Sequence, residues 1–145
     1  KIRVFGKRGE WFGKISPGRY DSVLIDAPCS SEAHVLQDGA ELAKWSSSRP
    51  KRLAKQQMAL LESALQCLKP SGGTLVYATC SINPVENQQL IAGFLEKYAN
   101  RVKLALPSTA LHPCEERSDF GITLLPDTTD MGPMFVSRML ISPKI

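Results

Sequence analysis

The sequence is poor in the residues that hold metals or disulfide frameworks. It has two histidines and four cysteines, and no two cysteines form a C-x-x-C pair. Structural zinc sites usually depend on such close ligand pairs, so we expect no metal site. A disulfide framework is also unexpected, because 43% of the residues are hydrophobic and suffice for an ordinary core. Free thiols in a reducing compartment are therefore the better interpretation.

Long apolar runs and the dinucleotide-binding fingerprint are missing as well. No run approaches the roughly 18 residues of a membrane span, so we expect no membrane partner. The Gly-x-Gly-x-x-Gly pattern is absent, and Gly72-Gly73 follows a predicted helix, where a helix-to-strand turn is the simpler interpretation. The length of 145 residues predicts one domain. Because the chain opens at Lys1 without a methionine, we expect a fragment or a processed product.

The basic residues are unevenly distributed along the chain. The formal net charge is +4, and of the 18 lysines and arginines six lie in residues 1–19 and five in residues 44–55. A basic segment beside an active site favours a polyanionic substrate such as nucleic acid, and a solvated surface run is the alternative. The candidates for phosphate contacts are Arg49, Lys51, Arg52 and Lys55.

Two short apolar runs, each followed by a cysteine, predict neighbouring strands of a parallel sheet. Tyr20–Asp26 leads to Cys29, and Thr74–Ala78 leads to Cys80. Both runs are β-branched or aliphatic, and both end in small, turn-forming residues. Lys51–Leu68 lies between them with apolar residues near helical spacing. The three segments complete the βαβ pattern that is typical of α/β proteins.

The carboxyl ends of these two strands predict a reactive site. Ligands of such sheets bind outside the carboxyl ends, and neighbouring strands lie about 5 Å apart. We therefore expect the sulfurs of Cys29 and Cys80 within roughly 12 Å of each other, with Asp26 within reach of both. Two small core residues would be the alternative, since free cysteine is often buried. Two cysteines at two strand ends beside one carboxylate favour the functional interpretation.

The rest of the chain predicts a second helix and several short segments. Asn83 is expected to cap a helix over residues 84–99, with Pro84 as its first residue and Glu86 closing a capping box. Trp45 and His34 are expected either to stack on a base or to pack against the protein. The remaining predicted elements are a strand at Ile2–Phe5, a long active-site loop over residues 30–50 with a helical piece at Glu41–Trp45, and strands at Val102–Leu106, Ile122–Leu125 and Met134–Ile141, the last two as an antiparallel pair.

These residues carry a resemblance to a known family. Residues 20–30 resemble the fourth motif of the Sun (Fmu-type) RNA cytosine-5 methyltransferases. Residues 69–81, followed by Glu86-Asn87, resemble the sixth motif, and Gln57 matches as well. Residues 132–139 are similar to the closing strand of the branch that acts on mitochondrial ribosomal RNA. The resemblance covers nearly the whole chain.

The resemblance implies an α/β, Rossmann-like fold that depends on S-adenosylmethionine. Residues 1–145 would be the C-terminal portion of a single catalytic domain, the end of a mostly parallel sheet with an antiparallel closing strand. The family's glycine-rich cofactor loop and the acidic residue that grips the ribose have no counterpart here, and Arg8 stands where an aspartate commonly contacts the adenine. Most of the cofactor site would then lie in the missing N-terminal half. The sheet edge left uncovered would favour self-association.

The resemblance also assigns roles to the site residues. Cys80 would be the nucleophile that adds to carbon-6 of cytosine, and Asp26 would hydrogen-bond the pyrimidine edge. Cys29 would assist removal of the carbon-5 proton and release of the product. Asp26 and Pro28 would contact the cofactor. The partner would be ribosomal or transfer RNA with its target base unstacked, in the bacterial cytoplasm or the mitochondrial matrix.

Two other functions fit parts of the sequence. In a DNA cytosine-5 methyltransferase Cys29 would itself be the nucleophile, but the Thr79-Cys80-Ser81 motif argues against this. A non-catalytic half-domain would only bind RNA or a partner protein, and the lack of a glycine-rich loop is consistent with it.

Overall fold

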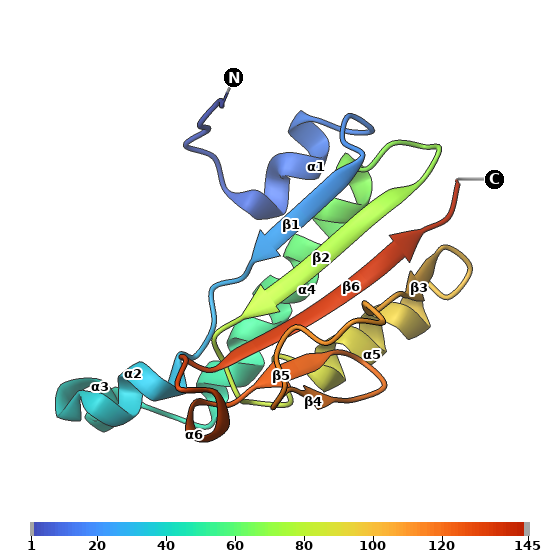
Figure 1. Ribbon diagram of the computed structural model, residues 1–145. Helices are drawn as coiled ribbons and strands as arrows, with labels where there is room; N and C mark the ends of the chain where they lie inside the picture. Colours follow the sequence, from blue (N-terminus) through green and yellow to red (C-terminus); the bar gives the residue numbers. More distant parts are fainter. Residues whose placement is uncertain (1, 144–145) are drawn as a thin grey trace.

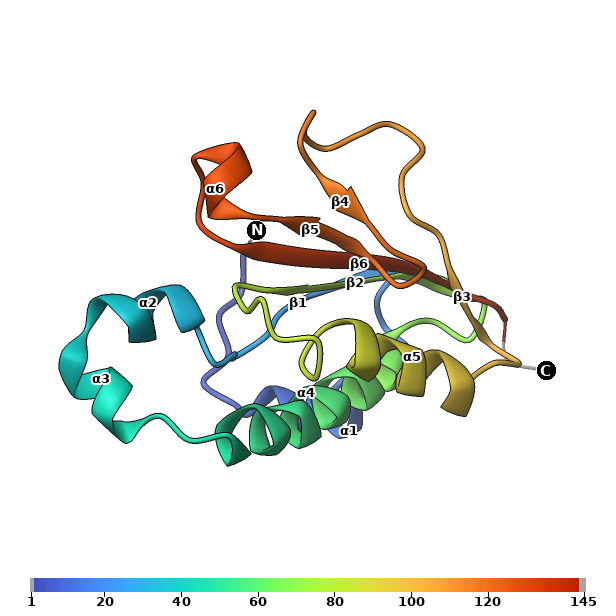
Figure 2. The ribbon, with the colours of Figure 1, turned by 90° about the horizontal axis from the view of Figure 1, so that it is seen from below.

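A single mixed β-sheet with its two long helices packed on one face forms the body of the molecule (Figure 1 and Figure 2). The structure, a computed structural model, describes residues 2–143. The strands are β1 Ser22–Asp26, β2 Gly73–Thr79, β3 Val102–Leu104, β4 Glu116–Arg117, β5 Ile122–Leu124 and β6 Met134–Ile141. The helical elements are η1 Gly9–Trp11, a 3-10 helix, and the α-helices α1 Phe12–Ile15, α2 Glu32–Gln37, α3 Gly39–Lys44, α4 Ser48–Cys67, α5 Gln88–Lys97 and α6 Pro126–Thr129.

β1 and β2 form the parallel pair that the sequence predicts. Ser22 lies beside Thr74, and Asp26 lies beside Ala78. The chain crosses from one strand to the other through α4, because two parallel strands cannot be joined by a tight hairpin. Figure 1 shows both strands ending at the same side of the sheet, near α2. The two cysteine-bearing loops therefore leave the sheet side by side.

β6 is the antiparallel closing strand. It pairs with β2 along residues 135–141, while on its other side the first half pairs with β5 and the second half with β3. The pairing of β5 with β6 confirms the antiparallel pair expected at the end of the chain. The strand order is β1-β2-β6-β5-β4, so β1 lies at one edge of the sheet. This arrangement confirms the expected end of a Rossmann-like sheet.

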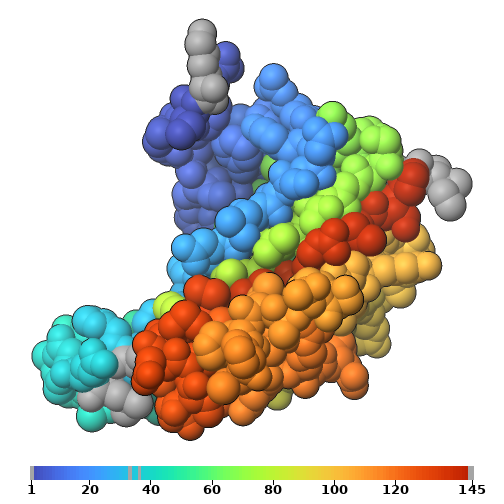
Figure 3. Space-filling view, viewed as in Figure 1, coloured from blue at the N-terminus to red at the C-terminus, as the bar shows by residue number. Residues whose placement is uncertain are grey.

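The core lies between the sheet and the two long helices. Leu75 and Tyr77 of β2 are fully buried in this core. The helices contribute Leu61 from α4 and Phe94 from α5, which are fully buried as well. Full burial of one such side chain contributes about 1.5–3 kcal/mol. On the opposite face, β1, β2 and β6 form adjacent stripes at the surface (Figure 3), and Leu24 of β1 is exposed there. The two long helices therefore cover one face of the sheet, as Figure 2 shows.

The expected start of the second helix is wrong. α5 begins at Gln88, and the preceding residues form turns. Asn83 does not cap a helix; its side-chain oxygen accepts a hydrogen bond from the Val85 N–H at 3.0 Å within a turn. Glu86 closes no capping box, because its carboxylate is fully buried and binds groups of another loop. Tertiary hydrogen bonds therefore override the local helix-start signal.

The segments on either side of β1 also differ from the prediction. Ile2–Phe5 forms no strand within the described residues, and its side chains are exposed without a neighbouring strand to pair with. In residues 30–50, α3 confirms the expected helical piece, although it begins at Gly39, and α2 is a further helix where a loop was expected. The Asp38 side chain caps α3 by accepting two backbone N–H groups. α4 begins at Ser48, because Pro50 is tolerated in a first turn, where its missing N–H is not needed.

Candidate active site

The two cysteines meet at the ends of the parallel strands. The sulfur of Cys29 lies 2.7 Å from the sulfur of Cys80, which confirms their predicted proximity. Both are free thiols; Cys80 is exposed and Cys29 is partly buried. The Ser31 hydroxyl lies 3.5 Å from the Cys29 sulfur and 3.3 Å from the Cys80 sulfur. One exposed and one sheltered thiol thus share a small polar site.

The surroundings of Cys29 favour its protonated form. Burial, and to a smaller extent the hydrogen bond with Cys80, raise the pKa of the Cys29 thiol from 9.0 to about 11, while the hydrogen bond with Ser31 opposes the change. A thiol with this pKa is almost entirely protonated at neutral pH, and the thiolate is the nucleophilic form. Cys80 is therefore the better placed of the two to attack a substrate from solvent.

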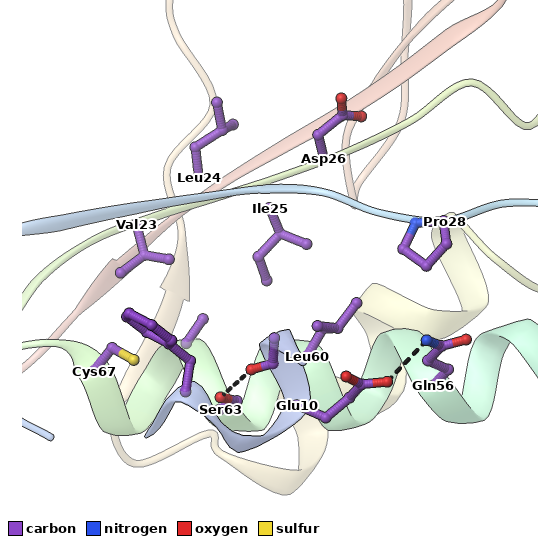
Figure 4. Close-up of a pocket in the computed structure, with 13 residues that line it drawn as sticks. Glu10, Val23, Leu24, Ile25, Asp26, Pro28, Gln56, Leu60, Ser63 and Cys67 are labelled. Atoms are coloured by element: carbon purple, nitrogen blue, oxygen red, sulfur yellow. Dashed lines mark hydrogen bonds between the residues drawn. The ribbon is translucent and has the colours of Figure 1, made fainter. Parts of the chain in front are cut away.

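Asp26 ends β1 beside Ala78, two residues before Cys80. Figure 4 shows its carboxylate on the face of β1 away from α4, whereas Val23, Ile25 and Pro28 point towards α4. The carboxylate is exposed and makes no hydrogen bond or ion pair with the part of the chain that the structure describes. Its predicted reach to both thiols stays a prediction.

A cavity of about 390 Å³ opens between β1, η1 and α4 (Figure 4). Pro28 and Asp26 line it, so the two residues expected to contact the cofactor border one cavity. Glu10 lines it too, and its carboxylate accepts a hydrogen bond from Gln56 at 2.8 Å. Arg8 hydrogen-bonds Glu10 at 3.1 Å and is the main cause that lowers the pKa of this carboxylate. Sequence reasoning missed Glu10; its one signal was an acid two residues after Arg8.

The four basic candidates lie on the first two turns of α4. Arg49 forms an ion pair with Glu41 at 3.5 Å, so its charge is partly committed within the protein. The other three are exposed and form no ion pair with any described residue: Lys51, Arg52 and Lys55. These three side chains are therefore available to pair with the negative charges of a polyanion.

Trp45 and His34 take different places. Trp45, together with Val35, Leu42 and Ile82, lines an apolar cavity of about 300 Å³ next to the loop that carries Cys80. His34 is exposed on α2 and is not among the residues that line this cavity. That Trp45 stacks on a base or packs against the protein stays a prediction.

A buried polar network joins the two cysteine loops, and sequence reasoning missed it. Glu86 accepts a hydrogen bond from the Ser30 N–H at 3.0 Å and another from Gln57 at 2.8 Å. Gln57 also donates to the Pro28 carbonyl at 2.8 Å. The available signal was a glutamine on the inner face of the α4 sequence, paired with a glutamate after the second cysteine. Both side chains are fully buried.

Two kinds of feature are absent from the described residues. Between residues 2 and 143 there is no cluster of three or more histidine, cysteine, aspartate or glutamate side chains with the geometry of a metal site. None of the helices in that range is both long and apolar enough to span a membrane.

Comparison with known proteins identifies the family. The family described as "16S rRNA methyltransferase RsmB/F" matches residues 5–140. The chain belongs to the RsmB/F family. Among curated relatives of this family, ribosomal RNA small subunit methyltransferase F of Erwinia tasmaniensis is 41% identical over 134 residues. The same enzyme of Salmonella agona is 37% identical over 134 residues. In both cases the match covers 90% of this chain, which spans 28% of the length of these relatives.

Solved structures share the RsmB/F fold. A methyltransferase homologue from Pyrococcus horikoshii has a TM-score of 0.72 and 26% identity, over 94% of this chain and 43% of the other. NSun6 from the same organism, solved with SFG, has a TM-score of 0.74 at 20% identity, over 94% of this chain and 34% of the other. At this low identity the second match speaks for the fold alone.

Proposed function

We propose that this chain supplies the cysteine pair of an S-adenosylmethionine-dependent RNA (cytosine-5) methyltransferase. The observation that carries the proposal is the 2.7 Å contact between the Cys29 and Cys80 sulfurs at the ends of two parallel strands, in a chain of the RsmB/F family. Residues 1–145 would form the C-terminal portion of one catalytic domain. Methyltransferases of this family use S-adenosylmethionine.

The chemistry needs a nucleophile from the protein because carbon-5 of cytosine is itself too poor a nucleophile to attack a methyl group. The Cys80 thiolate would form a bond to carbon-6, and the ring electrons would move to carbon-5, which then becomes nucleophilic. The cofactor supplies an electrophilic methyl group. After transfer, loss of the carbon-5 proton restores the double bond, and the bond between carbon-6 and Cys80 breaks. Cys29 would assist these last two steps, since its sulfur lies 2.7 Å from the Cys80 sulfur, beside the bond that must break.

The remaining residues would bind and orient the reactants. Asp26 would hydrogen-bond the pyrimidine edge with its carboxylate, which points away from α4, and with Pro28 it would border the cofactor, since both residues line one cavity. β1, which borders that cavity, is an edge strand of the sheet, and the residues that line the cavity would hold only part of the cofactor. Lys51, Arg52 and Lys55, with Arg49 more weakly, would contact phosphates.

The relatives favour small-subunit ribosomal RNA as the substrate over transfer RNA, and their bacterial sources favour the cytoplasm over the mitochondrial matrix. The two alternative functions are not favoured. A DNA-type mechanism would use Cys29 as the nucleophile, although its pKa is raised and its side chain is partly buried. A purely binding half-domain would not need two thiols in contact.

The test is covalent trapping by the full-length protein that contains this chain. Cys80→Ala should neither methylate RNA nor form an adduct with an oligonucleotide that carries 5-fluorocytosine. Cys29→Ala should attack but not release, so an adduct with unmodified RNA should accumulate. Mapping the modified peptide identifies the nucleophile. Equal loss of the adduct in both variants would contradict these roles.

A further inference from the structure

The loop that carries Cys29 is held on both sides of the cysteine. The Gln57 side-chain amide donates to the carbonyl of Pro28 at 2.8 Å, and the Glu86 carboxylate accepts from the N–H of Ser30 at 3.0 Å. Gln57 also donates to that carboxylate at 2.8 Å, so the two side chains brace each other. Both groups that face the Gln57 nitrogen are acceptors, which fixes the orientation of its amide. The backbone on either side of Cys29 is thereby anchored, at Pro28 to α4 and at Ser30 to the turn that precedes α5.

The loop that carries Cys80 is held by a different pair of side chains. The Asn87 amide donates to the carbonyl of Ser81 at 2.7 Å, and the Thr79 hydroxyl lies 3.3 Å from the N–H of Ser81. The Thr79 hydroxyl donates in turn to the Asn87 oxygen at 2.7 Å. Both side chains are almost fully buried. Both side chains of this pair thus hydrogen-bond the backbone of Ser81, the residue that follows Cys80.

Glu86 links the two arrangements. Its second carboxylate oxygen accepts hydrogen bonds from the hydroxyls of Ser30 and of Ser81, the latter at 3.3 Å. The two hydroxyls lie 3.2 Å apart. Within residues 2–143 no cation pairs with this buried carboxylate, so hydrogen-bond donors alone satisfy it. Because Glu86 and Asn87 are consecutive, one short segment reaches both cysteine loops.

We propose that Gln57 is a positioning residue for Cys29, that Thr79 and Asn87 are positioning residues for Cys80, and that Glu86 couples the two loops. The inference rests on the proposed function, in which Cys80 attacks and Cys29 assists release. Buried hydrogen bonds of this kind fix geometry, because a group left without its partner stays desolvated. Loss of one anchor should therefore impair one chemical step more than the other.

The experiment uses the full-length protein and separates attack from release. Gln57→Glu keeps the shape but sets an acceptor against the Pro28 carbonyl and the Glu86 carboxylate. It should slow release by about tenfold or more, so the adduct with ordinary RNA accumulates while attack on 5-fluorocytosine RNA is retained. Thr79→Val keeps the shape but removes the hydroxyl, and it should slow adduct formation without accumulation. Gln66→Glu, the same change at an exposed position of α4, should alter neither step.

Two variants of Glu86 test the coupling, one that keeps its hydrogen bonds and one that removes them. In Glu86→Gln the amide oxygen can still accept from the Ser30 N–H and from Gln57, and its NH2 can donate to the two serine hydroxyls, so most turnover should be kept. Glu86→Leu should impair attack and release together. Circular dichroism and thermal melting check that each variant is folded. If Gln57→Glu does not fold, Gln57→Met tests the same anchor without a second charge.

The outcomes distinguish this inference from the proposed function. Failure of Cys29→Ala to accumulate an adduct would contradict the proposed roles of the cysteines themselves. If Cys29→Ala does accumulate it, but Gln57→Glu and Thr79→Val reduce both steps equally, the assignment of separate anchors is overturned. Unfolding of both Gln57 variants would overturn it too, because the amide would then support the fold as a whole.

Discussion

The Cys29 thiol should alkylate far more slowly than an unperturbed thiol, and loss of Cys80 should narrow the difference. Burial is the main cause that raises the pKa of Cys29 from 9.0 to about 11, and the hydrogen bond with Cys80 comes second. A pKa two units higher leaves about a hundredfold less thiolate at pH 8. In Cys80→Ala the burial of Cys29 remains but the hydrogen bond is lost. The pH at which the alkylation rate of Cys29 is half-maximal should therefore lie between 9.0 and about 11 and equal neither value.

The assay is iodoacetamide labelling at a series of pH values, with peptide mass spectrometry to follow each cysteine of the full-length protein. Cys114 is exposed and serves as the reference for access of the reagent, and a small peptide thiol serves as the reference for reactivity. If Cys29 is labelled at pH 8 as fast as the peptide thiol, the reasoning from burial is refuted. An unchanged midpoint in Cys80→Ala would refute the contribution of the sulfur contact.

The same pKa predicts a pH-dependent stability. A folded-state pKa above the unfolded value stabilises the protein fully below about pH 9, and this stabilisation is lost as the pH rises towards about 11. The urea midpoint of the wild type should therefore fall over this range more steeply than that of Cys29→Ala. Parallel curves for the two proteins would contradict the raised pKa.

Three further predictions concern RNA, cofactor and packing. Replacing Lys51 and Arg52 by glutamine should weaken RNA binding, and the slope of log affinity against log salt concentration should flatten by roughly one to two units. Titration at several salt concentrations measures this slope. An unchanged slope would make the two residues ordinary surface residues. A polypeptide of these 145 residues should show no micromolar binding of S-adenosylmethionine by calorimetry, because it lacks a glycine-rich turn, and such binding by a monomer would contradict this. Gly121→Ala should destabilise the fold by about 1–3 kcal/mol in urea unfolding, since a methyl group there meets the Phe135 ring, whereas Gly39→Ala, which meets nothing, should not.

The meeting of the cysteines could be predicted from sequence because each step is local. The runs before Cys29 and Cys80 have the composition of buried strands, the helix between them forces a parallel pairing, and parallel strands end together. No step needed knowledge of distant side chains. The same local reasoning failed at Ile2–Phe5, where strand-like residues have no neighbouring strand, and at β4, whose two residues are too short to leave a pattern.

The anchoring network could not be predicted, because its signal imitates another motif. Asn83-Pro84-Val85-Glu86 has the residues of a helix start, and a carboxylate at the last position commonly closes a capping box. The choice is made by donors 29 and 56 residues away in sequence, the Gln57 amide and the Ser30 N–H. Sequence periodicity carries no information on such pairs.

The late start of α5 shows what this network demands of the fold. The four residues from Pro84 to Asn87 form turns, although a regular helix starting at Pro84 would have included them. In a regular helix successive side chains diverge by about 100° around the axis, so Glu86 and Asn87 would point to different sides. In the turn they are both buried, and they reach the two cysteine loops from one place. The lost helical hydrogen bonds are offset by buried ones at the site, which is where a departure from local preference is expected when it serves the chemistry.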